Sequence, residues 1–381
     1  MVLTLAWFTA FSSRSTTISV GPVMPLIQSD LNLSFSQLGL LFSIPPLMMG
    51  LFAIPSGLIM ARFGVKTVLL LSLSVLAVGC GLRAAAADIG SLYAFTALVG
   101  AGIGLVQPAL PRLVKDHFRA RTGVMTGIYS SGFAIGATTG AALAVPVLVP
   151  LFGRLSWRGP FIVWAALVAA TALAWVFVPG GDSRPRESLA PFGRIFRSRL
   201  CWHISLIFMT QNVLFYVLNS WLAGYYQSLG YPLTLAATAV ALLSAGSVVF
   251  GFGGPAISDR TGRKPPFVVA AVAGIFGILG LILVPTHLFW LWPFVCGSAT
   301  AVLFTTSLVI PVDVSRADEV GAFSGMMLTV GYGGGILGPL VIGFLRDVTG
   351  SNLYSLLAML FVCLVQLGLC IMMPETSPRH R

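Results

Sequence analysis

The stretch Asp259-Arg260-Thr261-Gly262-Arg263-Lys264 is a short charged loop between two long apolar stretches of the sequence. A related loop, Ala61-Arg62-Phe63-Gly64-Val65-Lys66, occurs 198 residues earlier and also stands between two apolar stretches. The first arginine, the glycine and the final lysine coincide under this shift. The shared pattern predicts a chain of two related halves, with one such loop in each.

The same 198-residue shift aligns glycines elsewhere in the two halves. It carries four glycines of one apolar stretch onto four of another: Gly123, Gly127, Gly136 and Gly140 onto Gly321, Gly325, Gly334 and Gly338. Glycine occupies 42 of 381 positions, so four matches at a shift fixed by another motif are not expected by chance. Small residues at this spacing let helices in a membrane approach closely, and we expect that role here.

The composition around the loops is that of an integral membrane protein. Apolar residues make up 57% of the chain and charged residues only 9%, whereas a soluble domain has about 25% charged residues. This excludes a soluble enzyme. Although the formal charge is +11, the sequence has no long basic run that would bind nucleic acid. The lipid bilayer is therefore the expected surrounding.

Apolar stretches bounded by charges, prolines and glycines predict twelve transmembrane helices. They cover residues 2–28, 35–60, 66–87, 91–113, 122–149, 160–179, 203–228, 233–257, 266–285, 288–313, 320–345 and 352–373. We expect an all-α membrane protein with two pseudo-symmetric six-helix bundles, residues 1–179 and 203–381, joined by a cytoplasmic linker over residues 180–202. Two such halves with a site between them suit alternating access.

The distribution of Lys and Arg predicts the orientation of the chain. With both termini in the cytoplasm, seventeen of the 22 basic residues lie on that side. Arg14 falls within a span, and the four on the outer side are Arg83, Arg154, Arg158 and Arg346. This bias satisfies the positive-inside rule. We expect a multi-pass, monomeric protein of the cell's inner (plasma) membrane with cytoplasmic termini.

The paired loops resemble the Gly-x-x-x-Asp-Arg-x-Gly-Arg-Lys/Arg signature of the major facilitator superfamily. Nearly the whole chain is similar to the cyanate and nitroimidazole permease branch. The similar residues are Arg14 followed by Gly21-Pro22, Gly81-Leu82-Arg83, Phe215-Tyr216 with Trp221-Leu222, Gly331-Tyr332 with Gly338-Pro339, and Arg346-Asp347 with Gly350. The resemblance implies the facilitator fold and transport of a small solute. The branch usually has Asn-Leu-Arg-Pro where this chain has Ser12-Ser13-Arg14-Ser15. The resemblance therefore does not imply cyanate as the substrate.

Arg14 is the strongest candidate for a binding residue, because it lies near the centre of the first span. A charge there costs at least ~2.5–3.5 kcal/mol even on insertion scales, and no Asp or Glu falls deep in another span. The planar fork of arginine suits small planar anions. We therefore expect a small-molecule substrate that is anionic or strongly electron-rich. The alternative is an arginine fixed by carbonyls and hydroxyls of neighbouring helices.

The 198-residue shift identifies further polar residues as candidates for substrate binding. It maps Arg14 onto Asn212 and Gln107 onto Thr305. The resemblance implies that the four helices carrying these residues line the central cavity. We expect all four side chains to contribute to substrate binding.

Four further candidates complete the expected binding set. Tyr216 and Asn219 follow Asn212 at helical spacing, so the three share one helix face. Tyr129 and Tyr332 lie in glycine-rich spans. Polar packing between helices is the alternative for each of these residues.

The loop residues are expected to form a cytoplasmic latch that gates access. The resemblance implies that the motif's carboxylate, Asp259, interacts with a neighbouring helix end and helps hold one access state. The basic gating residues are Arg62, Lys66, Arg260 and Arg263. Ala61 stands where the first half's carboxylate would be, so the latch is expected to be lopsided. Positive-inside charge alone is the alternative.

The leading hypothesis is a secondary transporter for a small anion or a small polar or aromatic solute. The sequence shows no metal cluster, nucleophile with a base or carboxylate pair, so no enzyme activity, metal or cofactor is expected. All eleven acidic residues and four histidines fall in loops, tails or span ends. The alternatives are a multidrug efflux pump, which a deep acidic residue would favour, and a non-transporting membrane sensor, which should carry a larger cytoplasmic segment.

Overall fold

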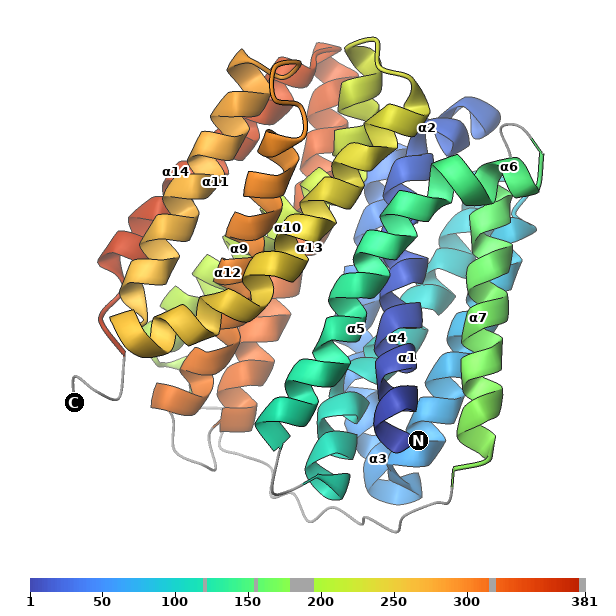
Figure 1. Cartoon of the computed structure of the whole chain (residues 1–381), viewed down its shortest axis with the longest axis vertical. Coiled ribbons are helices and arrows are strands. Elements are labelled where there is room, and N and C mark those ends of the chain that lie inside the picture. The colour runs from blue at the N-terminus through green and yellow to red at the C-terminus, as the bar shows by residue number, and fades with distance from the viewer. Residues whose placement is uncertain (119–121, 154–156, 179–194, 315–319, 377–381) are drawn as a thin grey trace. The chain divides into compact units, whose positions relative to one another are not determined.

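The computed structural model describes residues 1–118, 122–153, 157–178, 195–314 and 320–376, and these residues are almost entirely helical (Figure 1). The N-terminal half contains α1 (Val2–Ile18), α2 (Val20–Leu31), α3 (Phe35–Ala84), α4 (Ile89–His117), α5 (Thr122–Leu143), the π-helical turn η2 (Ala144–Leu148), α6 (Val149–Leu151) and α7 (Arg158–Val176). The C-terminal half contains α9 (Arg199–Ser228), α10 (Leu233–Thr261), α11 (Lys264–Leu283), α12 (Leu291–Val314), α13 (Val320–Thr349) and α14 (Asn352–Met372).

The described residues include eleven helical segments that are long and apolar enough to cross a membrane. The predicted all-α membrane fold is therefore confirmed. Two compact units make up the chain. One comprises Met1–Glu187 and Leu222–Ala241, and the other comprises Ser188–Trp221 and Leu242–Arg381.

The first expected span, residues 2–28, is divided in the structure. It corresponds to α1 and α2, which meet at Ser19 and are each too short to count among the eleven. Pro22 explains the division, because it has no N–H to donate to the Ile18 carbonyl one turn earlier. Ser19 itself keeps helical dihedral angles (φ −60°, ψ −17°).

A glycine turn is shared by the two loop motifs. The expected spans 35–60 and 66–87 appear as one helix, α3, with a kink at Gly64 (φ 81°, ψ 166°). Its counterpart Gly262, between α10 and α11, also has a positive φ of 93°. Glycine adopts such angles without the steric cost that a Cβ would add, which explains why both motifs carry it.

Other helix boundaries differ from the expected ones by a few residues. α9 begins at Arg199 instead of residue 203, so the end of the expected linker is helical. The fifth expected span ends in the π-helical turn η2, where Pro146 has no N–H for a regular helical hydrogen bond. These differences arise from local backbone chemistry and leave the order of the helices as predicted.

Glycines of α5 allow this helix to pack closely against α1. A Cβ at Gly140 would lie 2.8 Å from the carbonyl oxygen of Ser15, and a Cβ at Gly136 would collide with the carbonyl oxygen of Phe11. The Ser15 hydroxyl also donates to the Gly136 carbonyl oxygen at 3.0 Å. The absence of side chains at these positions therefore permits direct backbone contact between the two helices.

The C-terminal half repeats this arrangement between α13 and α9. A Cβ at Gly334 would collide with the carbonyl oxygen of Met209, and one at Gly338 would lie 3.2 Å from the Cα of Val213. Met209 and Val213 are the 198-residue shifts of the residues that α5 contacts on α1. The internal repeat predicted from the sequence is therefore confirmed by equivalent contacts.

Replacing Gly334 with Ala should lower the unfolding temperature, because the added carbon meets the Met209 backbone. Gly333→Ala is the matched control, since a Cβ there would have nothing within 4 Å. Alanine is favoured over glycine by about 1 kcal/mol in a helix interior, so the control should be neutral or stabilising. Thermal unfolding of both purified variants in detergent measures the difference. An equal loss in both would contradict the close seating of α13 on α9.

Candidate functional site

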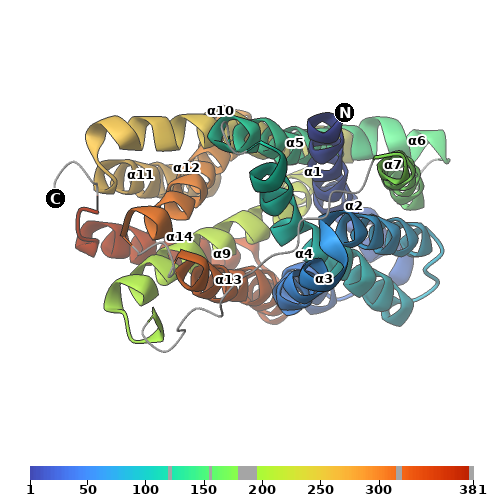
Figure 2. The ribbon, with the colours of Figure 1, turned by 90° about the horizontal axis from the view of Figure 1, so that it is seen from below.

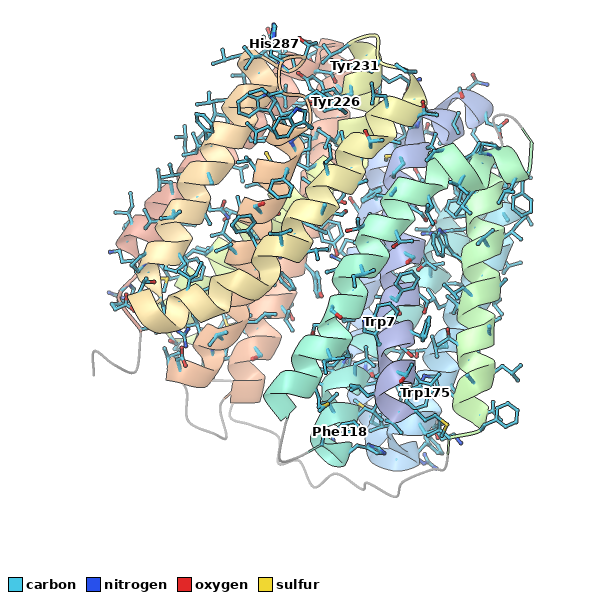
Figure 3. All side chains as sticks on the ribbon, in the orientation of Figure 1. Trp7, Phe118, Trp175, Tyr226, Tyr231 and His287 are labelled. Atoms are coloured by element: carbon cyan, nitrogen blue, oxygen red, sulfur yellow. The ribbon has the colours of Figure 1, made fainter. Side chains whose placement is uncertain are left out.

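α1, the helix that carries Arg14, is fixed by α5 and α7. Figure 2 shows α1 between these two helices. The indole N–H of Trp7 donates to the Ser131 hydroxyl of α5 at 2.9 Å. From the other side, the indole N–H of Trp175 on α7 donates to the Thr9 hydroxyl of α1 at 2.9 Å (Figure 3). Arg14 therefore projects from a helix that is held on two sides.

Arg14 stands in a run of buried hydroxyl residues, which are Ser12, Ser13, Ser15, Thr16 and Thr17. Each of these hydroxyls donates to a carbonyl three or four residues earlier in α1, at 2.6–3.1 Å. Their hydrogen atoms are thus used by carbonyls of α1, shared in the case of Ser15 with the Gly136 carbonyl of α5, while oxygen lone pairs remain. The half-buried Arg14 supplies this stretch with positive charge and a fork of N–H donors.

The three candidates on α9 form one buried face. Asn212, Tyr216 and Asn219 are 3%, 2% and 0% exposed. Each asparagine donates an amide N–H to a carbonyl one turn earlier, those of Phe208 and Phe215, at 2.8 Å. The Oδ1 atom of Asn219 has no hydrogen-bond partner. A buried acceptor without a donor is unfavourable by about 1–3 kcal/mol.

The remaining binding candidates lie on four further helices. Gln107 on α4, Thr305 on α12 and Tyr332 on α13 are half-buried. Tyr129 on α5 is 5% exposed and packs edge-on against Phe133, with 6.3 Å between ring centres. Its aromatic packing is also what a purely structural tyrosine would show.

Arg83 is a buried cation that the sequence placed on the outer side. It is 1% exposed. Its guanidinium donates to the Thr96 hydroxyl at 3.0 Å and to the Thr16 carbonyl oxygen at 3.3 Å, and lies 5.4 Å from the centre of the Phe161 ring. Arg83 thereby ties the end of α3 to α4, α7 and α1, two residues from Arg14. The sequence could not indicate this, because its partners are uncharged groups on three other helices.

A second contact fixes the far end of α2. Asp30 accepts from the indole N–H of Trp157 at 2.8 Å and from the guanidinium of Arg158 at 2.9 Å. These hydrogen bonds, that of Trp157 first, hold the pKa of Asp30 below its usual value. Arg158 also donates to the carbonyl of Ala86, just beyond α3, at 3.2 Å. Arg158 thus connects the end of α2 to the residues just beyond α3.

Two carboxylates hold the loop motif of the C-terminal half. The Arg263 Nε donates to Asp313, near the end of α12, at 2.6 Å, and its Nη1 donates to the Ser258 hydroxyl at 3.0 Å. Glu375, just beyond α14, accepts from the backbone N–H groups of Arg263 at 2.8 Å and Lys264 at 3.2 Å. Glu375 thus places negative charge at the N-terminus of α11, where the helix dipole favours it.

The loop motif of the N-terminal half is held by the opposite chemistry. Lys66 donates from Nζ to the carbonyl oxygens of Val176, at 3.0 Å, and Val178. These carbonyls lie at the C-terminal end of α7, where a positive charge is favourable. The 198-residue shift maps Phe177 onto Glu375. Each loop is therefore bound by the end of the last helix of its own half, with donor and acceptor exchanged.

The gating candidates differ in their surroundings. Lys66 and Arg263 have the partners described above, whereas Arg62 is exposed and lies 5.1 Å from the centre of the Phe63 ring. The side chains of Asp259 and Arg260 lie outside the described part of the chain. Sequence reasoning did not identify Asp313 and Glu375 as partners of Arg263, although the 198-residue shift could have directed attention to the position of Glu375.

Asp313→Asn should destabilise the protein more than Asp116→Asn. The Arg263 and Asp313 side chains are 6% and 11% exposed, and removing one partner of a buried pair costs ~3–5 kcal/mol. Asp116, near the end of α4, pairs with Arg112 on the same helix, and such i,i+4 pairs contribute about 0.3–0.5 kcal/mol. Thermal unfolding of the two variants compares them. Equal losses would show that the Arg263–Asp313 pair does not hold this loop.

The described residues contain no group of three or more His, Cys, Asp or Glu side chains that could hold a metal ion. The chemistry of the candidate site therefore rests on one guanidinium, amides, hydroxyls and aromatic rings. Such groups bind and orient a solute by hydrogen bonds and charge.

Comparison with known proteins identifies the family. The model of the Major Facilitator Superfamily matches residues 6–339. The cyanate transport protein CynX of Escherichia coli (strain K12) is 27% identical over 368 residues, covering 96% of this chain and 94% of that protein. The 2-nitroimidazole transporter of the same organism is 28% identical over 374 residues, covering 95% and 92%. The nucleoside transporter NupG shares the fold, with a TM-score of 0.81 at 14% identity over 98% of this chain and 100% of that one. The chain belongs to the major facilitator superfamily.

Proposed function

We propose that this protein is a secondary transporter for a small solute with an anionic or electron-rich end, which Arg14 binds. The observation that carries the proposal is the setting of Arg14 in α1. The neighbouring hydroxyl hydrogens are used within the helix, so Arg14 is the charged donor of this stretch. A guanidinium offers a planar fork that matches small planar groups with two acceptor atoms.

The names of two relatives support this substrate class. One relative transports cyanate and the other 2-nitroimidazole. Cyanate is a small linear anion and 2-nitroimidazole is a small planar ring, and both carry electron-rich atoms that a guanidinium can bind. An efflux pump for apolar drugs or a non-transporting sensor gives no comparable role to Arg14.

The other candidates would complete the site as the two bundles, residues 1–179 and 203–381, alternate between access states. Asn212 and Tyr216 of α9 would also bind the solute, with Asn219 one turn further along the same helix. Gln107, Thr305, Tyr129 and Tyr332 would contribute further polar contacts. The half-buried state of Gln107, Thr305 and Tyr332 supports this role.

The loop motifs would act as the latch of the transport cycle. Lys66 and Arg263 are each bound to the end of another helix in their own half, and Asp259, Arg260 and Arg62 would add charge to the same loops. A latch of this kind biases the equilibrium between access states. It would therefore change the apparent affinity for substrate through the fraction of competent protein.

We further propose a monomer in the inner (plasma) membrane with both termini and the linker, residues 180–202, in the cytoplasm. The support is the bias of basic residues, seventeen against four. Moving a monoanion inward against an inside-negative potential costs ~2.3 kcal/mol per 100 mV. Exchange against an internal anion, or entry together with a proton on the substrate, would supply this free energy.

Arg14→Ala should weaken the binding of labelled cyanate by about tenfold or more and abolish its counterflow in proteoliposomes. Loss of a hydrogen bond to a charged group, worth ~1.5–3 kcal/mol, corresponds to about tenfold to a hundredfold in affinity. Arg14→Lys should retain less substrate binding than its positive charge alone would suggest, because the planar fork of arginine is lost. Equilibrium binding and counterflow measure both variants.

Arg197→Ala is the matched control, because it removes an exposed arginine. It should leave binding and counterflow unchanged. Size-exclusion profiles and unfolding temperatures establish that each variant is folded. An affinity of Arg14→Ala within about twofold of the parent, far below the effect expected for a charged hydrogen bond, would show that Arg14 does not bind the substrate.

A further inference from the structure

The short segment that leads into α9 exposes two aromatic rings. Phe196 and Trp202 are 62% and 37% exposed, and their rings meet edge to face with 5.4 Å between ring centres. The indole N–H of Trp202 donates to the Phe196 carbonyl oxygen at 2.9 Å. This hydrogen bond uses the only polar group of the indole, so the exposed parts of both rings are apolar.

The same segment is anchored in the core of the C-terminal half. Ile195 and Cys201 are 6% and 0% exposed, and both belong to one buried cluster with Phe267 of α11. Backbone hydrogen bonds close the turn, because the Ser198 N–H donates to the Ile195 carbonyl at 3.0 Å and the Trp202 N–H donates to the Ser198 carbonyl at 3.2 Å. The aromatic pair therefore has a defined place on the surface of this half.

Two arginines accompany the aromatic pair. The side chains of Arg197 and Arg199 are exposed, and neither forms a hydrogen bond or an ion pair with the described part of the chain. Arg199 is the first residue of α9, and Trp202 follows it at a spacing that makes two side chains neighbours on a helix. The first turn of α9 contains no acidic residue. Two cations are thus available to an outside anion, next to apolar rings.

These four side chains lie at the end of a membrane span. Arg199–Ser228 is one of the helical segments that are long and apolar enough to cross a membrane. Aromatic rings are enriched where the acyl chains of a bilayer meet the headgroups, and arginines next to a span are attracted to the anionic lipids of the cytoplasmic leaflet. In the proposed orientation this end of α9 faces the cytoplasm.

We infer that Phe196, Arg197, Arg199 and Trp202 form a surface that binds an anionic phospholipid. The guanidinium groups pair with the charged headgroup, and the rings contact the glycerol and the first carbons of the acyl chains. Rings alone would accept any phospholipid, whereas the two cations select an anionic one. Neither arginine belongs to the proposed substrate site, so a failure of this inference leaves the role of Arg14 unaffected.

Fluorescence quenching by brominated lipids tests the inference on the full-length protein in phosphatidylcholine vesicles. Bromine on an acyl chain quenches a tryptophan that the lipid contacts. Subtracting the signal of Trp202→Phe, which keeps an aromatic ring, isolates Trp202 from the other tryptophans. Brominated phosphatidylglycerol should reach half-maximal quenching of Trp202 at a mole fraction about fivefold lower than brominated phosphatidylcholine, the fold-change expected for one arginine near an anionic surface.

The double variant Arg197→Gln/Arg199→Gln should abolish this preference. Quenching by brominated phosphatidylcholine should persist, because the rings remain at the bilayer. The double variant Arg379→Gln/Arg381→Gln is the matched control, since it removes two positive charges from another part of the sequence and should keep the preference. Each variant is compared with its own Trp202→Phe background.

Equal quenching by the two lipids in the parent, or a preference that persists without Arg197 and Arg199, would overturn the inference. Loss of the preference in the matched control as well would reduce it to total charge and would also overturn it. Loss of the preference when glycerol phosphate is added at constant ionic strength would identify a free phosphate ester as the occupant and contradict a lipid partner.

Discussion

Polar groups inside a membrane must find partners within the protein, and the structure of α1 depends on this constraint. Five hydroxyls on this helix donate to carbonyls of the same helix. The helix can therefore be rich in serine and threonine and still cross an apolar medium. Their hydrogens are no longer free to bind a solute, so the guanidinium of Arg14 becomes the main source of donors and charge. The binding role proposed for Arg14 follows from this use of the hydroxyl hydrogens within the helix.

Arg14 can keep a defined position only if α1, the helix that carries it, is held firmly. The glycines of α5 let the α1 backbone come close, and Trp7 and Trp175 bind α1 to α5 and α7. Arg83 reaches the Thr16 carbonyl from α3. The loop motifs are bound by charged groups at helix ends, through Lys66 in one half and through Asp313 and Glu375 in the other.

The sequence predicted the order and type of the main helices because apolar length and charge placement depend on composition along the chain. The 198-residue shift also predicted which glycines are equivalent, since close helix packing needs a missing side chain at the same place in each half. The sequence pattern did not predict that the first span is divided at Ser19, although Pro22 was a usable signal of the division. It also missed the burial of Arg83 and the binding of the loop by Glu375, because their partners are distant in sequence and include backbone groups. The orphaned oxygen of Asn219 could not be foreseen, because it depends on which hydroxyls are already engaged.

A thermal-shift series on the unmodified protein tests the central claim, a site for an anionic or electron-rich solute, most directly. A ligand that binds the folded state raises the unfolding temperature in proportion to its occupancy. At constant ionic strength, bicarbonate, nitrate and cyanate should each raise it in a saturable way, whereas the apolar cation tetraphenylphosphonium should not. Saturable stabilisation by tetraphenylphosphonium, with no response to the three anions, would contradict the account.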